Sequence, residues 1–299
     1  MKPGPDATVG QALRDGLARV TSAPATVAGT LALTLLFSLP PLQPNLTPAD
    51  VLFSHYLTFA TWPPGFAAMP VCLWLLANLD AAAGGLSNLV SDAIWLVLWS
   101  FLLGGLIDRF ARNRPTRGPG FFGACGAHFG PMLRLGLTEL AFDLAAFLLL
   151  APRIAARPSA RAVTLLLVIA AGVLVHYARV RLVVEDRRSA ASAILAGGRF
   201  VRRNFAGAVT IYLLFGAGLV IPYLLLLNTR TADGTWLLLA GGEILMAMQL
   251  FLALASLAAA AALFQSRLAH ASYTAGPQQV WPESPAAEAI ANLAPSIHS

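Results

Sequence analysis

The chain has 299 residues, of which 57% are hydrophobic and only 11% are charged; an average globular protein has about a quarter charged residues. Its mean hydropathy is +0.69. This composition excludes a water-soluble enzyme built around one buried core, and it excludes intrinsic disorder for all but the chain ends. We therefore expect an integral membrane protein.

The charge balance is +6, and Lys2 is the single lysine, so the positive charge is almost wholly arginine. These arginines flank apolar blocks, as in membrane proteins that orient by their basic loops, so we expect no nucleic-acid partner. The two cysteines, Cys72 and Cys125, lie too far apart for a metal-binding spacing. Charged residues precede the first apolar run and no small-residue cleavage site follows it, so no secretory signal is expected.

Six apolar stretches reach the length of about 20 residues that a helix needs to cross the hydrocarbon core. Helices are expected because each backbone amide in lipid must find its partner within its own segment. The fold class predicted is all-α, a polytopic membrane helical bundle with about six transmembrane helices and cytoplasmic amphipathic helices. The predicted spans are 24–42, 86–107, 132–151, 162–180, 205–227 and 236–264.

A seventh apolar block, Phe66–Leu79, is shorter than a span, contains Pro70 and is followed by Asp80. We interpret it as a helix lying at the membrane interface, with Trp62 and Trp74 at headgroup depth. The alternative is that it spans, which would move the C-terminus to the other side.

The distribution of basic residues predicts the direction of the chain. With six spans and an inner N-terminus, most of the 20 lysine and arginine residues lie on the inner side. Both termini are therefore expected in the cytoplasm of a cell with this protein in its inner membrane. The exceptions, placed outside, are Arg153, Arg157, Arg161 and Arg230.

An apolar stripe at helical spacing precedes the first, third and fifth spans, which suggests three copies of one unit: a basic surface helix, a span outward, a turn and a span inward. The alternative is that any helix leading into a span carries such a stripe. The domains expected are a cytoplasmic amphipathic segment (1–23), a six-span membrane domain (24–269) and a flexible cytoplasmic tail (270–299). The stripes are Val9, Leu13, Leu17 and Val20; Phe121, Cys125, Phe129 and Met132; and Ile194, Gly198, Val201 and Phe205.

Arg199, Arg202 and Arg203 occupy the other side of the third stripe. This arrangement suits a helix that lies on an anionic inner leaflet, so these arginines are predicted to contact lipid headgroups.

Two sequence motifs resemble those of uncharacterised bacterial six-span membrane proteins and, more loosely, of the membrane domain attached to some glycerophosphodiester phosphodiesterases. The first runs from Gly104 to Arg112, and the second joins Glu185-Asp186-Arg187-Arg188 to Gly198-Arg199-Phe200-Val201-Arg202-Arg203-Asn204. The resemblance covers roughly residues 98–272 and implies an inner-membrane helical protein without a known activity. The phosphodiesterase catalytic domain has no counterpart in this sequence, so that activity is not carried over.

Ionisable residues within spans are costly and are therefore candidates for function. Glu139 and Asp143 are four residues apart, on one face of the third predicted span. Glu243 and His176 are expected at similar depths in other spans. Together these residues form a candidate intramembrane site for a proton or a cation. The alternative is a set of structural polar links, in which Glu139 pairs with Arg134 and Asp143 bonds a neighbouring helix.

The sequence contains no His-Glu-x-x-His, Gly-x-Ser-x-Gly or phosphate-cradling glycine motif, so we predict neither an enzyme nor a cofactor or metal. Two functions remain. The first is a non-enzymatic membrane protein that organises lipid or partner proteins through its basic helices. The second is a small proton-linked transporter or channel that uses Glu139, Asp143, His176 and Glu243. A membrane-protein partner or a second copy of the chain is left open.

Overall fold

The computed structural model describes residues 8–38, 89–156, 158–229 and 236–267. These residues form eight α-helices and no strand, so the all-α prediction is confirmed for this part of the chain. The predicted interfacial segment Phe66–Leu79, Cys72 and the tail 270–299 lie outside it. The helices are α1 (Val9–Thr21), α2 (Pro24–Ser38), α5 (Leu89–Arg112), α6 (Gly118–Ala156), α7 (Pro158–Val184), α8 (Ala190–Arg203), α9 (Phe205–Thr229) and α10 (Trp236–Ser266).

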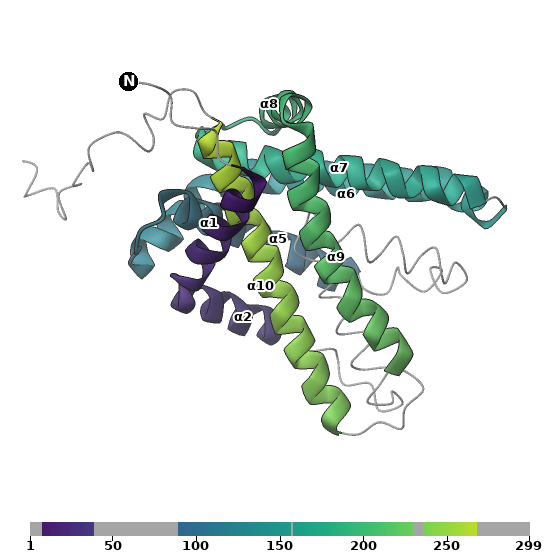
Figure 1. Cartoon of the computed structure of the whole chain (residues 1–299), viewed down its shortest axis with the longest axis horizontal. Coiled ribbons are helices and arrows are strands. Elements are labelled where there is room, and N and C mark those ends of the chain that lie inside the picture. The colour runs from purple at the N-terminus through teal and green to yellow at the C-terminus, as the bar shows by residue number, and fades with distance from the viewer. Residues whose placement is uncertain (1–7, 39–88, 157, 230–235, 268–299) are drawn as a thin grey trace, which may run out of the picture.

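Two long helical hairpins, α6–α7 and α9–α10, extend in different directions from a shared centre (Figure 1). Helix α10 contacts α1, α2, α5, α7 and α9, so it is the central helix of the described fold. A run of small side chains, residues 258–262, is buried along it. Small side chains let neighbouring helix backbones approach closely, which explains how one helix accommodates so many neighbours.

Of the described residues, one segment, Ala247–Ser266 of α10, is both long and apolar enough to cross a membrane, and 78% of its most apolar stretch is buried within the protein. A shorter apolar stretch, Phe205–Gly218, lies in α9. The core helix of a soluble protein meets the same criterion, so the six-span arrangement remains a prediction.

The amphipathic helix α1 packs on α10 through small residues. Thr8 caps its N-terminus, and Thr8 and Gln11 form a reciprocal capping box. A Cβ added to Gly16 would lie 2.5 Å from the backbone nitrogen of Ala259, so only glycine permits this approach. The buried face is therefore rotated from the predicted stripe, and Leu17 of that stripe is exposed.

Helix α8 shows the same shift. Its buried residues are Ala193, Ala196, Gly197 and Phe200, whereas Ile194, Gly198 and Val201 of the predicted stripe are only partly buried. A Cβ on Gly197 would lie 2.9 Å from the backbone nitrogen of Ala178 in α7. In both helices the point of closest backbone approach decides which face is buried.

The second amphipathic segment differs because it is continuous with the span predicted to follow it. Residues 118–156 form one helix, α6, without the break that Ser22 makes after α1 and Asn204 makes after α8. Its Cys125 packs against Gly105 of α5, where an added Cβ would lie 2.4 Å from Sγ.

The three amphipathic segments thus follow one packing pattern. The first part of α6 lies on α5, and α8 lies on α7, so each packs on the helix that ends the preceding predicted unit. Helix α1 packs on α10, the last helix described. The first and last units therefore meet, and the series closes on itself.

Candidate functional site

A buried ion pair joins α6 to α7. Glu139 of α6 pairs with the guanidinium of Arg179 of α7, and the two residues are 8% and 1% exposed. Arg134, suggested by sequence as the partner of Glu139, is exposed instead. Because each charge neutralises the other, the pair satisfies the requirement that buried charges be compensated.

His176 extends this polar region to α10. It is fully buried, its Nε2 lies 3.4 Å from the Oγ of Ser256, and its ring meets that of Tyr212 of α9 edge to face at 5.9 Å. His176 and Arg179 are three residues apart, on one face of α7. The series Glu139, Arg179, His176 and Ser256, here named the buried polar series, therefore connects α6, α7 and α10.

Two of the four residues predicted for an intramembrane site belong to this series, Glu139 and His176. Asp143 lies in α6 and Glu243 in α10, but their side chains lie outside the described residues. The structure therefore brings Glu139 and His176 into one series through Arg179.

A second polar cluster fixes α1 to the ends of α5 and α10. Arg19 Nη1 donates to the Phe110 carbonyl at 3.0 Å and to Gln265 Oε1 at 2.8 Å, while Nη2 pairs with Asp15 at 2.6 Å. Gln265 Nε2 donates to the Ala111 carbonyl at 2.8 Å. Arg19 therefore bonds within the protein, although the sequence places it among the basic residues of the inner side.

An open hollow of about 400 Å³ lies between α1 and α10 beside this cluster. The two charged side chains in its lining, Asp15 and Arg19, are already paired with each other. The hollow therefore offers no uncompensated charge to a ligand. It is lined by Gln11, Ala12, Asp15, Arg19, Ala262, Gln265 and Ser266.

The turn between α7 and α8 carries a third ionic group. Glu185 accepts from Arg181 and from Arg187, and the Arg181 guanidinium also lies 5.2 Å from the centre of the Phe264 ring. Partial burial opposes ionisation of Glu185, but the hydrogen bonds and charges of the two arginines outweigh it and lower its pKa below the usual value. This carboxylate therefore ties the end of α7 to its turn.

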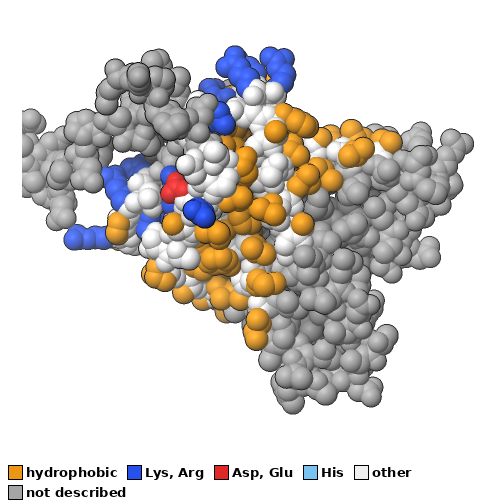
Figure 2. Space-filling model, in the orientation of Figure 1, with side chains coloured by type: hydrophobic (Ala, Val, Ile, Leu, Met, Phe, Trp, Pro, Cys, Tyr) orange, Lys and Arg blue, Asp and Glu red, His pale blue; other side chains and the backbone are white. Residues whose placement is uncertain are grey.

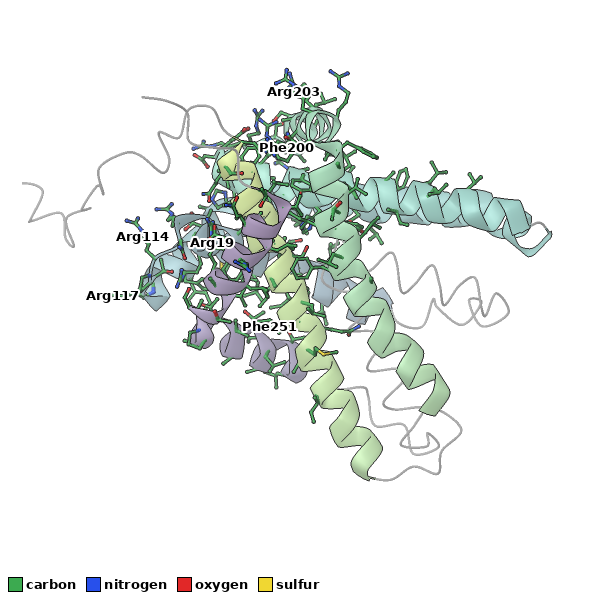
Figure 3. The ribbon with its side chains drawn as sticks, in the orientation of Figure 1. Arg19, Arg114, Arg117, Phe200, Arg203 and Phe251 are labelled. Carbon is green, nitrogen blue, oxygen red and sulfur yellow. The ribbon has the colours of Figure 1, made fainter. Side chains whose placement is uncertain are left out.

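The arginines predicted to meet lipid are on the outer surface. Arg199, Arg202 and Arg203 of α8 are exposed. Figure 3 shows Arg203 pointing away from the molecule, as Arg114 and Arg117 do, whereas Arg19 lies among the helices. In Figure 2 these basic side chains stand at the edge of the molecule, next to a wide hydrophobic surface.

Within the described ranges, no three His, Cys, Asp or Glu side chains gather as a metal site would require. No protein family, curated protein or solved structure matches the chain.

Sequence reasoning missed the roles of Arg179, Arg19 and Gln265. Basic-residue counting places Arg179 on the inner side, at the end of the predicted span 162–180, yet it lies three residues after His176 in the pattern His-Tyr-Ala-Arg, which places the two on one helix face. That spacing was the available signal for a partner of Glu139. Nothing in the sequence pairs Arg19 with Gln265, because they are 246 residues apart.

Proposed function

We propose that the protein is a multi-span inner-membrane protein, with both termini in the cytoplasm, that organises lipid or partner proteins and does so without catalysis. The observation that carries the proposal is the apolar outer surface of the long helices. Leu166 of α7, Leu214 of α9 and Ile244 of α10 are 66%, 54% and 69% exposed. Large apolar side chains exposed on several helices form a surface that suits lipid better than water.

The polar groups support the same reading. The buried charges described above are paired with one another or with backbone carbonyls, and Arg199, Arg202 and Arg203 of α8 are exposed. Figure 2 shows this separation of basic edge and hydrophobic surface. An inner-leaflet surface attracts arginines placed in this way.

Fractionation and topology mapping test the proposal together. We expect the chain to stay in the membrane fraction after alkaline carbonate or urea washing. In a background without native thiols (Cys72→Ser, Cys125→Ala), an impermeant maleimide applied to intact spheroplasts should label Ala232→Cys, in a predicted outer loop. It should label Ser189→Cys, exposed at the start of α8, only after lysis. Recovery of the chain in detergent-free buffer, or the reverse labelling, would contradict the proposal.

Proton-linked transport is the second candidate, and the buried polar series across α6, α7 and α10 favours it. A proton path requires a carboxylate that binds and releases a proton. In this series that carboxylate is Glu139, which is paired with Arg179. In liposomes loaded with a pH-sensitive dye, transport through this site predicts a proton flux that Glu139→Gln abolishes. A flux-free wild type leaves the organising function as the better account.

A further inference from the structure

Helix α8 presents three different surfaces around its axis. One packs on α7 through Ala193, Gly197 and the residues that flank them. At 3.6 residues per turn, Ile194 and Val201 fall on one flank of this contact, and Arg199 and Arg203 fall on the opposite flank. The helix is therefore held by the protein on one side, while an apolar flank and a basic flank remain on either side of the contact.

The apolar side of α8 continues into exposed surface. Phe205, at the junction with α9, is 65% exposed, whereas Leu195, 68% exposed, lies between Arg202 and Arg199 around the helix axis. Burying an exposed phenylalanine in water-excluding surroundings is favourable. The junction between α8 and α9 is therefore suited to insertion among lipid acyl chains.

The basic side of α8 has no counter-charge in the structure. The helix sequence contains no acidic residue, and within the described residues no carboxylate pairs with Arg199, Arg202 or Arg203. These three arginines are also exposed, in contrast to Arg19 of α1, which is committed to Asp15, Phe110 and Gln265. Of the two separate amphipathic helices, α8 therefore keeps its positive charge available.

The orientation of α8 matches a membrane surface. In Figure 1 the axis of α8 is viewed end-on, whereas α9 runs lengthwise down the picture, so the two helices lie crosswise. A helix that crosses the bilayer along α9 leaves α8 in the plane of the interface. Basic residues on one flank and apolar residues on the other are the pattern of a helix in that plane.

We propose that α8 is an interfacial helix that binds anionic phospholipid headgroups through Arg199, Arg202 and Arg203, with Phe205 inserted among the acyl chains. This inference rests on the proposed function and deepens it, because it names one helix and one lipid class. Helix α1, by contrast, is a protein-bound helix that fastens α5 to α10. The surface that selects lipid is therefore on α8 and not on α1, although both helices are amphipathic.

Lipid selection in detergent tests this assignment. The purified full chain is equilibrated with an equimolar trace mixture of phosphatidylglycerol and phosphatidylethanolamine, repurified, and its bound lipids are counted by mass spectrometry. Each arginine near an anionic surface contributes roughly a fivefold preference, so we expect the wild type to enrich phosphatidylglycerol by about fivefold or more. The variant R199Q/R202Q/R203Q should lose most of that enrichment.

The matched control is R14Q/R114Q/R134Q, which removes three exposed arginines, from α1, the α5–α6 connection and α6, and the same total charge. It should keep the enrichment, and size-exclusion profiles should show both variants folded. Equal loss in the two variants, or no enrichment in the wild type, would overturn the assignment. A third outcome is that the wild type shows no lipid selection but retains an acidic membrane protein that the R199Q/R202Q/R203Q variant loses. This face would then bind a protein partner, and the proposal would again be wrong.

The two proposals fail in different ways. A chain that leaves the membrane without detergent contradicts the proposed function. A chain that remains in the membrane but binds both lipids equally contradicts only the lipid assignment of α8.

Discussion

Gly16 of α1 lies so close to Ala259 of α10 that a Cβ at position 16 would meet the Ala259 nitrogen at 2.5 Å. The contact is between a glycine and a helix backbone, so no flexible side chain can move aside. The docking of α1 therefore depends on the absence of one methyl group.

Gly16→Ala should loosen α1 from α10. The substitution forces the backbones apart, and overpacking of this kind costs about 1–3 kcal/mol. We expect faster hydrogen exchange and faster proteolysis within Val9–Thr21 of the detergent-solubilised protein. Gly10→Ala is the matched control in the same helix, since a Cβ there meets only Thr8 Oγ1 at 4.0 Å. Equal effects of the two substitutions would show that helix propensity, not packing, governs α1.

The Glu139–Arg179 pair predicts a strongly non-additive mutant cycle. Glu139→Gln leaves the Arg179 charge buried without compensation and should cost about 3–5 kcal/mol of unfolding free energy. Arg179→Met should cost a similar amount because it leaves Glu139 alone. The double variant should recover most of the loss, since neither charge remains. The measurement is denaturant unfolding in mixed micelles, and a double variant as unstable as the sum of the singles would contradict a structural role for the pair.

Glu185 should stabilise the protein only where its carboxylate is ionised. Burial alone would raise its pKa, but the arginine contacts lower it in the folded state. The stabilisation is therefore complete above the ordinary carboxylate pKa of about 4.3 and is lost as the pH falls through the lower folded value. Glu185→Gln should reduce the melting temperature at neutral pH, and the two proteins should converge in strong acid. The exposed neighbour Asp186→Asn provides the control.

Cys125 should be unreactive in the folded protein. Its thiol is fully buried, and this burial raises its pKa to about 11. At pH 8 the thiolate is then on the order of one thousandth of the population, and the thiolate is the reactive form. In a Cys72→Ser background, we expect no maleimide labelling until denaturant is added. Rapid labelling of the folded chain would mean that α6 separates from α5 at Gly105.

The helices show most clearly how much of this structure the sequence predicts. Apolar length and period indicated helices over 132–151 and 236–264, and the structure has helices there. The same signals placed the buried stripe of α1 on Val9, Leu13, Leu17 and Val20, whereas Ala12, Gly16 and Arg19 are buried together with Val20 alone of that stripe. The hydrophobic period of a sequence shows which face of a helix avoids water. It does not show whether that face contacts lipid or protein, because both are apolar. Close packing then selects small residues for the protein contact.

The candidate site was anticipated in part. Intramembrane charge drew attention to Glu139 and His176, and both are buried. Their connection depends on Arg179, which basic-residue counting treats only as an inner-side charge because it lies at the end of the predicted span 162–180. Long-range partners such as Arg19 and Gln265 carry no local pattern, so only the three-dimensional structure joins them.

The seating of α1 on α10 fixes an order of events during biosynthesis. Arg19 and Gln265 are 246 residues apart, and translation proceeds at roughly 5–20 residues per second. The ribosome therefore releases α1 tens of seconds before its binding surface is made, on the order of 12–50 s. During that interval the α1 face that carries Ala12, Gly16 and Arg19 has no α10 to pack on. A premature stop codon before α10 therefore yields a product in which α1 lacks its packing partner.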